Sequence, residues 1–429
     1  MVRSVAWLVR GGITLYNLMN MSKSQIDVAQ LQRRDPSAWT ALLRQVLQTD
    51  DVVVTAVSAE PLPTSLYQAK IPHLVRYTLA LRGHSDPITC IAKRTNRRET
   101  IFYRQLAPHL PQITPRCWFS YLDEEQGWII LDDIPRHHLP TNWSAEQVET
   151  VIQEMAFIHA TFWNREEELA ELGFPYFIGN KVYSLKELRE EQAIYFEQGP
   201  GAIISSHALQ HAGNLAPLLV QAANGLTVLQ ELGGWPGIIT ETHLQALSDL
   251  LDDPLPMIAP LRELPLTLLH GDPHSRHWQL TLFNEFYLTD WHKLSIGPSV
   301  LDLVNFLEQF DLLFVNNEEW QLVVREERPI TDETMIDTYL LALSGLLPGE
   351  FNARLVRQAI PAAQCLYVLT GWMSAFANWF AQKPSKITWQ KVNKMNDEEL
   401  KGTVFRPLVA FRPYLNGVFN RFLQAYRKL

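Results

Sequence analysis

Cysteine is scarce in this chain, and long apolar runs are missing. The 429 residues include three cysteines, Cys90, Cys117 and Cys365, which lie far apart and form no C-x-x-C pair. This spacing excludes a disulfide framework and makes a reducing cytoplasm the expected compartment. No apolar run approaches the roughly 20 residues that are needed to cross a bilayer, so we expect no membrane span.

Basic clusters are also missing. The chain carries 37 Lys and Arg against 46 Asp and Glu, a net charge of −9, and it has no long basic run. This balance argues against nucleic acid as a general partner, because phosphate backbones attract clustered Lys and Arg. A neutral or cationic small molecule fits such a surface better.

The first third of the chain predicts a small sheet. Residues 1–34 are expected to form a poorly ordered N-terminal extension, with Met21 as an alternative start. Asp35-Pro36 is typical of a helix start, with Asp at the N-cap and Pro at the first helical position. β-Branched, partly alternating segments then predict five strands, and a helix at 97–106 is inserted after the third. The predicted strands are 51–59, 74–82, 88–94, 117–122 and 127–134.

From about residue 135 the pattern is mostly helical. A capping box, Ser144 and Gln147, opens a helix over 144–163. Residues 267–291 interrupt the helices and predict a hairpin with an aspartate at the end of each strand, Asp272 and Asp290. The other predicted helices are 184–196, 241–251, 301–315, 332–346 and 353–382.

This order of elements predicts an α+β, protein-kinase-like fold with two lobes. The N-lobe, 35–134, would be a small antiparallel sheet with one helix, and the C-lobe, 135–429, would be larger and mostly helical. In such a fold a nucleotide binds between the lobes.

Four charged residues could carry phosphoryl transfer, in the chain order that this chemistry uses. Transfer from ATP needs a carboxylate to orient and deprotonate a hydroxyl, a second carboxylate on Mg²⁺, and a Lys fixed by a Glu against the phosphates. Asp272, Asp290, Lys93 and Glu99 are the candidates. Because six residues separate Lys93 from Glu99, an ion pair between them requires the helix to start immediately.

Other interpretations of the same residues stay open. Lys93 and Glu99 could be solvated surface charges, and Asp272 could form a turn before Pro273. A metal hydrolase could use Asp272 and Asp290 together with several nearby histidines. Gly271-Asp272-Pro273 argues against a helix that would align them. These histidines are His270, His274, His277 and His292.

Several segments resemble the motif set of the aminoglycoside phosphotransferase and choline/ecdysteroid kinase superfamily. HGDPHSRH, LTDW and GPSVLDL are similar to its catalytic segments, RRETIFYRQLAP to its Glu-x-x-Phe-Tyr helix, and GWIILDDI to its hinge. The resemblance covers about Val52 to Phe306. It implies an ATP-dependent kinase that phosphorylates a hydroxyl of a small acceptor, which could contain an amine or a sugar.

The resemblance also implies roles for individual residues. Asp272 would be the catalytic base and Asp290 the Mg²⁺ ligand. Lys93 and Glu99 would bind the phosphates, and Asp302 would brace the catalytic loop. The hinge that meets adenine would be Asp132, Asp133 and Ile134, and the supporting residues would be His270 and His274.

Two departures from the family pattern leave a second hypothesis open. His277 stands where the family has an Asn as second Mg²⁺ ligand; imidazole suits softer ions such as Mn²⁺ or Zn²⁺. The link between the first two strands, residues 58–73, contains no Gly for a phosphate-covering loop, so Thr64 or Ser65 would have to contribute. The alternative is therefore a catalytically silent, kinase-like protein that binds a nucleotide or a partner.

The acceptor site has no comparably specific pattern. Trp372, Phe376 and Trp379 recur at helical spacing. An aromatic cage for a quaternary ammonium group would use such residues, but a stripe packed in the core is the favoured interpretation.

Overall fold

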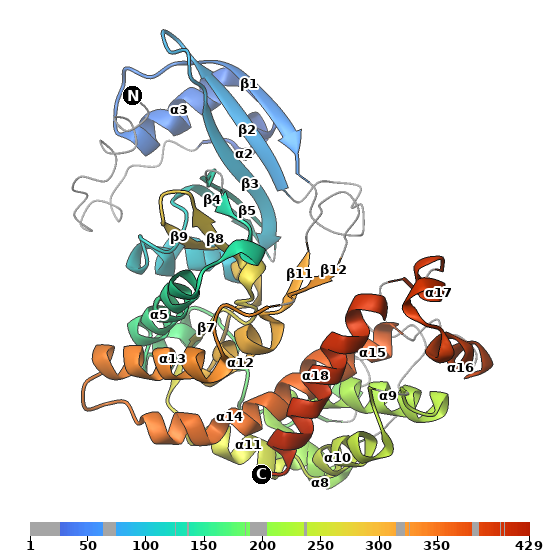
Figure 1. Ribbon diagram of the computed structural model, residues 1–429. Coiled ribbons are helices and arrows are strands. Elements are labelled where there is room, and N and C mark those ends of the chain that lie inside the picture. Colours follow the sequence, from blue (N-terminus) through green and yellow to red (C-terminus); the bar gives the residue numbers. More distant parts are fainter. Residues whose placement is uncertain are drawn as a thin grey trace. The chain divides into compact units, whose positions relative to one another are not determined.

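A computed structural model describes residues 26–62, 74–124, 126–134, 137–184, 186–188, 204–235, 238–314, 322–325, 327–379, 386–403, 405–406 and 408–429. The chain divides into two compact units, residues 1–135 and 136–429 (Figure 1). The first contains a five-stranded antiparallel sheet and the second is mostly helical, which confirms the predicted α+β class.

The first unit is a sheet in the order β1-β2-β3-β5-β4, and every neighbouring pair is antiparallel. Each predicted strand is present, and the inserted helix continues as one π-helical turn, Phe102–Leu106. The elements are α2 (Val28–Gln32), α3 (Pro36–Leu47), β1 (Val54–Pro61), β2 (Leu74–Leu81), β3 (Ile88–Asn96), α4 (Arg97–Ile101), β4 (Cys117–Asp123) and β5 (Gln126–Asp132).

Helix α3 packs its apolar side against the sheet. Asp35 caps it by accepting the Ser37 N–H, as predicted. Trp39 is fully buried, and its indole N–H donates to the Leu31 carbonyl of α2. Residues 26–34, expected to be poorly ordered, are therefore part of the folded unit, because α2 joins the core through Leu31. Residues 1–25, including Met21, lie outside the described residues.

A glycine on β5 lets α4 approach the sheet closely. A Cβ added at Gly127 would lie 1.8 Å from the Thr100 hydroxyl oxygen, so a larger residue would push the helix away. The close approach brings the first turn of α4, which carries Glu99, next to β3.

The second unit packs helices around short strands. Helix α5 lies against α13, and α14 against α18 (Figure 1). Its helices are α5 (Ala145–Thr161), α6 (Glu166–Glu171), α8 (Ser206–Ala212), α9 (Ala216–Leu232), α10 (Glu241–Asp252), α11 (Leu255–Arg262), α12 (Val300–Gln309), α13 (Asp332–Leu346), α14 (Ala353–Tyr367), α15 (Ser374–Trp379), α16 (Lys386–Lys394), α17 (Asp397–Lys401) and α18 (Leu408–Tyr426). Its strands are β6 (His137–His138), β7 (Leu266–Leu269), β8 (Trp278–Thr281), β9 (Phe286–Leu288), β10 (Ser295–Pro298), β11 (Leu312–Phe314) and β12 (Leu322–Val324).

The predicted hairpin at 267–291 is wrong as a single hairpin. Strand β7 pairs with β10, whereas β8 pairs with β9 and β6. The chain leaves β7 because Gly271 takes a left-handed φ of 82° and Pro273 has no N–H to donate to a ladder. Asp272 and Asp290 nevertheless each follow the end of a strand.

Three predicted helices need correction or fall outside the described residues. The helix predicted at 301–315 ends at Gln309, because β11 pairs with β12 instead of continuing it. The helix predicted at 353–382 is interrupted by a π-helical segment, Val368–Met373, and residues 380–385 are outside the described part. Most of the predicted 184–196 helix is also outside it. The capping box of Ser144 and Gln147 on α5 is confirmed.

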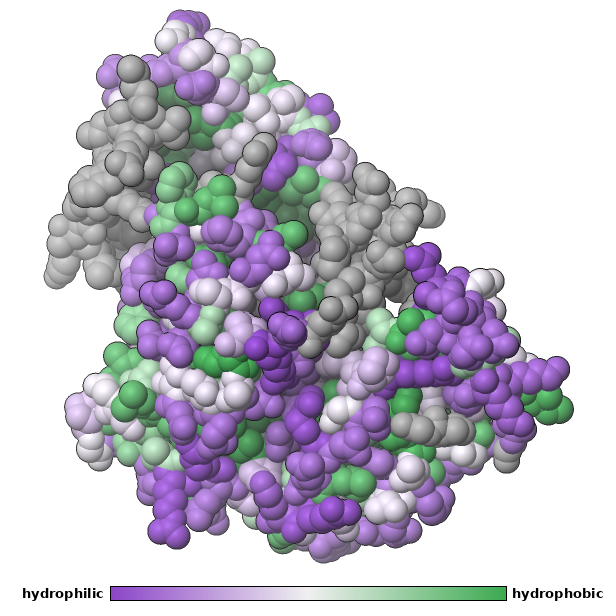
Figure 2. Space-filling view, in the orientation of Figure 1, coloured by the Kyte–Doolittle hydropathy of each residue, from purple (hydrophilic) through white to green (hydrophobic). Residues whose placement is uncertain are grey.

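Of the predicted aromatic stripe, Phe376 belongs to the core and Trp372 packs beside it, whereas the side chain of Trp379 lies outside the described part. Phe376 is fully buried, with its ring 6.0 Å from that of Trp372 and 6.1 Å from that of Phe419. Hydrophilic side chains cover much of the visible surface of this unit (Figure 2). Among the described residues, no helix is both long and apolar enough to span a membrane.

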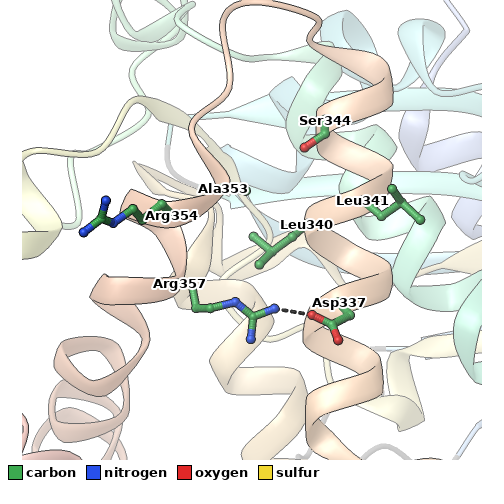
Figure 3. A pocket seen from close by; sticks show the side chains of 7 residues that line it. All are labelled: Asp337, Leu340, Leu341, Ser344, Ala353, Arg354 and Arg357. Atoms are coloured by element: carbon green, nitrogen blue, oxygen red, sulfur yellow. Dashed lines mark hydrogen bonds and ion pairs between the residues drawn. The ribbon is translucent and has the colours of Figure 1, made fainter.

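An open hollow of about 560 Å³ lies between α13 and α14 (Figure 3). Arg357 crosses it to form ion pairs with Glu333 and Asp337. None of the residues that line it belongs to the site predicted from the sequence.

Candidate active site

In the first unit, Lys93 and Glu99 form a buried ion pair. The Lys93 ammonium lies 2.9 and 2.7 Å from the two carboxylate oxygens of Glu99. The Glu99 residue is fully buried, and the Lys93 side chain is 15% exposed. The Thr95 hydroxyl also donates to the Glu99 carboxylate. Glu99 therefore holds the Lys93 amine in one position at the edge of β3.

The pair forms because α4 begins at once after β3. The Asn96 side chain caps the helix by accepting the Glu99 N–H at 3.1 Å. This cap turns the chain within three residues. The helix therefore starts immediately after the strand, as an ion pair between Lys93 and Glu99 requires.

The predicted hinge residues begin at the last residue of β5, Asp132. The Asp132 carboxylate accepts the Trp118 indole N–H at 2.5 Å, and the Asp133 carboxylate pairs with Arg76 at 2.8 Å. Both side chains thus point to partners in the first unit. The family resemblance implies that the main chain of Asp132, Asp133 and Ile134, and not these side chains, would contact adenine.

In the second unit, a buried carboxylate fixes the loop that carries Asp272. Asp302 on α12 is 2% exposed and accepts the N–H groups of His270 at 2.7 Å and Gly271 at 3.0 Å. The His159 ring on α5 approaches the same carboxylate at 3.3 Å and also contacts the Tyr339 hydroxyl. Asp302 on α12 thus braces the loop, and His159 on α5 and Tyr339 on α13 extend this hydrogen-bond network.

Gly271 is required where the loop passes the following segment. A Cβ on this residue would lie 2.5 Å from the Lys293 carbonyl oxygen, and its φ of 82° disfavours residues with a side chain. The close contact sets the Asp272 segment beside residues 290–293.

The Asp272 carboxylate lies beside positive charge. The Lys293 ammonium is 2.7 Å from Oδ2, and the Gln309 amide donates to Oδ1 at 3.4 Å. Burial alone would raise the pKa of this carboxyl, but the neighbouring basic side chains, with Lys293 paired to it directly, outweigh burial, and the pKa lies below its usual range. Asp272 is therefore ionised and oriented.

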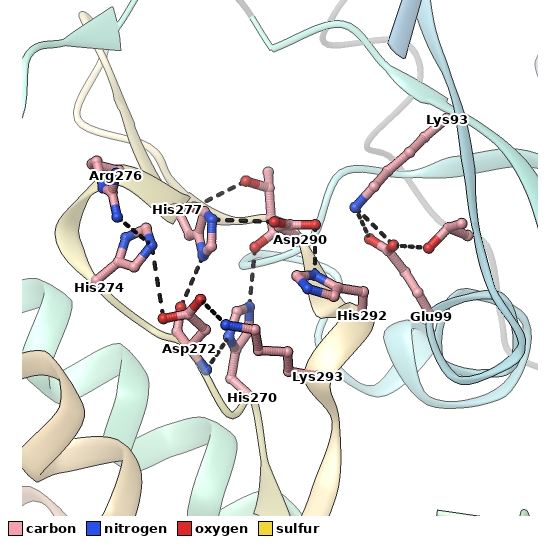
Figure 4. Close-up of polar contacts among 12 residues, drawn as sticks. Lys93, Glu99, His270, Asp272, His274, Arg276, His277, Asp290, His292 and Lys293 are labelled. Carbon is pink, nitrogen blue, oxygen red and sulfur yellow. Dashed lines mark hydrogen bonds and ion pairs between the residues drawn. The ribbon is translucent and has the colours of Figure 1, made fainter. Parts of the chain in front are cut away.

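One imidazole ring links the two aspartates. His277 Nδ1 lies 2.8 Å from the Asp272 carbonyl oxygen, and Nε2 lies 3.2 Å from the Asp290 carboxylate (Figure 4). The other Asp290 oxygen lies 2.9 Å from His292 Nδ1. Asp290 has a left-handed φ of 69°, which is uncommon for a residue other than Gly. The Asp272 main chain and the Asp290 carboxylate thus contact opposite nitrogens of one ring.

The remaining histidines are supports. His270 Nδ1 accepts the Asp272 N–H and Nε2 donates to the Thr289 carbonyl, so neither ring nitrogen is left for a metal. Burial, with a contribution from His277, lowers the pKa of His270 to about 4. The His274 ring accepts from Arg276 at 3.1 Å through Nε2. Both histidines therefore act as neutral hydrogen-bonding groups.

A hydrolase-type metal centre fits this arrangement poorly. Asp272, His274 and His277 can place ligand atoms within 4.8 Å of one another. However, His274 Nε2 already accepts from Arg276, and Asp272 is paired with Lys293. A further cation there would face two fixed positive charges.

Comparison with known proteins adds structural likenesses. No protein-family model and no curated protein matches the chain. Similar solved structures include a choline kinase from Cryptosporidium parvum, at 14% identity and a TM-score of 0.43, covering 87% of this chain and 90% of that one. An aminoglycoside phosphotransferase from Alicyclobacillus acidocaldarius has 11% identity and a TM-score of 0.41, covering 84% and 92%.

A spectinomycin phosphotransferase, solved in complex with ADP and spectinomycin, has 12% identity and a TM-score of 0.41, covering 88% of this chain and 94% of that one. At such identities the likeness says nothing about the substrate of this chain.

Sequence reasoning missed some residues that shape the site. Lys293 lies two residues after the quoted LTDW segment, and its place three residues after Asp290 is the one available signal. Nothing in the sequence connected His159 or Gln309 with the Asp272 loop, because both meet it only through the tertiary fold.

Proposed function

We propose that this protein is an ATP-dependent kinase that transfers the γ-phosphoryl group to a hydroxyl of a small acceptor. The observation that carries the proposal is the position of His277 between the two aspartates: its Nδ1 contacts the Asp272 main-chain carbonyl, and its Nε2 contacts the Asp290 carboxylate. The buried Lys93–Glu99 pair and the quoted motifs support it independently.

Asp272 would orient the acceptor hydroxyl and take its proton. As the bond from that oxygen to the γ-phosphorus forms, the bond to the β–γ bridging oxygen breaks and ADP leaves. Because this transition state is loose, orientation contributes more than basicity, and an ionised carboxylate with a lowered pKa suits the role. Lys293 would keep Asp272 from rotating away.

The other residues would bind the nucleotide. Lys93, fixed by Glu99, would contact its phosphates, and the main chain of Asp132 to Ile134 would meet adenine. Asp290 and His277 would hold a divalent ion, Mg²⁺ or Mn²⁺, which neutralises phosphate charge when it is bound. Their donor set fits such an ion, since one carboxylate oxygen and one imidazole nitrogen lie side by side.

The test is ATP consumption with a panel of amino alcohols, aminoglycosides and sugars, first in Mg²⁺ and then in Mn²⁺. With an acceptor that turns over, Asp272→Asn should lower kcat by about 10²–10⁴-fold and leave ADP affinity nearly unchanged. Asp252→Asn, which alters an exposed carboxylate at the end of α10, is the matched control. Equal turnover by D272N and D252N would contradict the role of Asp272.

A silent nucleotide-binding protein is the second candidate, and His277 in place of the family's Asn is the observation that favours it. It predicts that ATP raises the melting temperature while no acceptor in the panel is phosphorylated with either ion.

A further inference from the structure

We infer that His277 is a metal ligand through Nε2, and that the site selects a transition ion such as Mn²⁺ or Zn²⁺ over Mg²⁺. The inference deepens the proposed function, because it concerns the ion that would accompany the nucleotide. The inference depends on which nitrogen of the His277 ring carries hydrogen, and the hydrogen bonds of the ring determine this.

The Asp272 carbonyl determines which nitrogen carries hydrogen. A carbonyl oxygen only accepts, so His277 Nδ1, at 2.8 Å from it, must be the N–H. In the neutral ring, Nε2 then presents a lone pair to the Asp290 carboxylate oxygen at 3.2 Å. Two electron-rich atoms are stable at this distance only when they share a positive species, either a proton or a metal ion.

The surroundings hold both atoms in this position. The His274 ring, 4% exposed, stacks on His277 with centroids 3.8 Å apart and an interplanar angle of 34°. The second Asp290 oxygen is held by His292 at 2.9 Å. A histidine bonded to a carbonyl through one nitrogen, facing a fixed carboxylate with the other, has the outer contacts that metal-binding histidines normally have.

The separation of the two atoms matches one ion. Two ligand atoms that each lie about 2.1 Å from a transition ion, at about 100° to each other, are themselves about 3.2 Å apart. Nucleotide phosphates and water would complete the coordination, as is usual where a protein supplies few ligands.

The nitrogen donor decides the preference. Mg²⁺ strongly favours oxygen ligands, whereas imidazole suits Mn²⁺ and Zn²⁺, which gain affinity from it. An Asn at position 277 would offer an amide oxygen instead, and the preference for Mn²⁺ or Zn²⁺ over Mg²⁺ would be lost. His277 is therefore the residue that sets metal choice.

Pulsed electron paramagnetic resonance of Mn²⁺ tests the inference on the full chain, with Mn²⁺ alone and with Mn²⁺ and ADP. Bound Mn²⁺ should show modulation from a directly coordinated nitrogen, and labelling histidine with ¹⁵N should change that modulation. In His277→Asn the modulation should vanish and the Mn²⁺-to-Mg²⁺ affinity ratio should fall about 10–100-fold. His207→Asn, an exposed histidine of the same unit, should change neither.

The labelled wild-type protein keeps the test decisive even if H277N does not fold. Bound Mn²⁺ without nitrogen modulation, or equal affinity ratios in the wild type and H277N, would overturn the inference. Phosphoryl transfer in Mg²⁺ would then still support the proposed kinase. Nitrogen modulation without any phosphoryl transfer would support the inference and count against the kinase.

Discussion

The two units position their charged residues in different ways. In the first, Lys93 and Glu99 meet through a strand end, one cap residue and one helical turn, all within residues 93–99. In the second, the Asp272 loop is fixed by Asp302, His159 and Lys293, which come from distant segments. A local pair depends on one turn, whereas the loop depends on the packing of the whole unit.

Removal of the Asp302 carboxylate should have the largest effect. In Asp302→Ala the buried N–H groups of His270 and Gly271 lose their acceptor, which should cost about 3–5 kcal/mol in the free energy of unfolding. Hydrogen exchange of a peptide over residues 266–280 should accelerate strongly, while a peptide over β3 stays protected. Equal acceleration of both peptides would contradict the separate anchoring of the two units.

Acid should weaken the second unit through His270. The folded pKa is about 4, whereas a histidine in an unfolded chain titrates near about 6.5. Between these values the unfolded chain binds a proton that the folded unit excludes, so the free energy of unfolding falls as the pH drops from about 6.5 to 4. The full loss is about 3 kcal/mol, and His274, whose pKa is also lowered by burial, adds to it.

Urea titrations of the wild type and His270→Gln at several pH values measure this effect. The variant should be less stable at pH 7 and should show a shallower pH dependence below about 6.5. An unchanged slope would show that His270 is not the group that titrates.

Gly271→Ala should disturb the loop without removing any charge. The left-handed φ and the contact with the Lys293 carbonyl should cost about 1–3 kcal/mol. We expect kcat to fall more than ADP affinity, because Asp272 shifts while the residues of the first unit do not. Gly345→Ala, at an open position on α13, is the control. Comparable losses in both variants would argue against a special role for Gly271.

Glu99→Gln should have the smallest effect on stability and remain local. Gln keeps an acceptor for the Thr95 hydroxyl but leaves Lys93 without its counter-ion, at a cost of about 1–2 kcal/mol. ADP affinity should fall, while hydrogen exchange over residues 266–280 stays as in the wild type. Faster exchange over residues 266–280 would show that the Lys93–Glu99 pair also affects the Asp272 loop, and would contradict a purely local role for this pair.

The same contrast explains what the sequence could predict. The strands of the first unit, the Asp35 cap and the Lys93–Glu99 pair depend on neighbours in sequence, and all are present in the structure. The capping box of α5 is local as well. Such features follow from backbone propensities and caps, which a single sequence carries in full.

The rest depends on contacts between distant segments. The pairing of β7 with β10 replaced the predicted hairpin, and the contact of His159 with Asp302 joins residues 143 positions apart. His159 falls within the helix predicted over 144–163, but nothing in that pattern indicates its partner. The packing of the helices decides such pairs, so motif spacing alone could not reveal them.

In the proposed site, Asp290 and His277 hold an ion beside Asp272. The most direct test is a crystal structure with Mn²⁺ and a non-hydrolysable ATP analogue, with anomalous scattering recorded at the manganese edge. The account predicts a peak within bonding distance of His277 Nε2 and the Asp290 carboxylate, and a γ-phosphate facing Asp272. A manganese peak away from both side chains, with the nucleotide bound elsewhere, would contradict it.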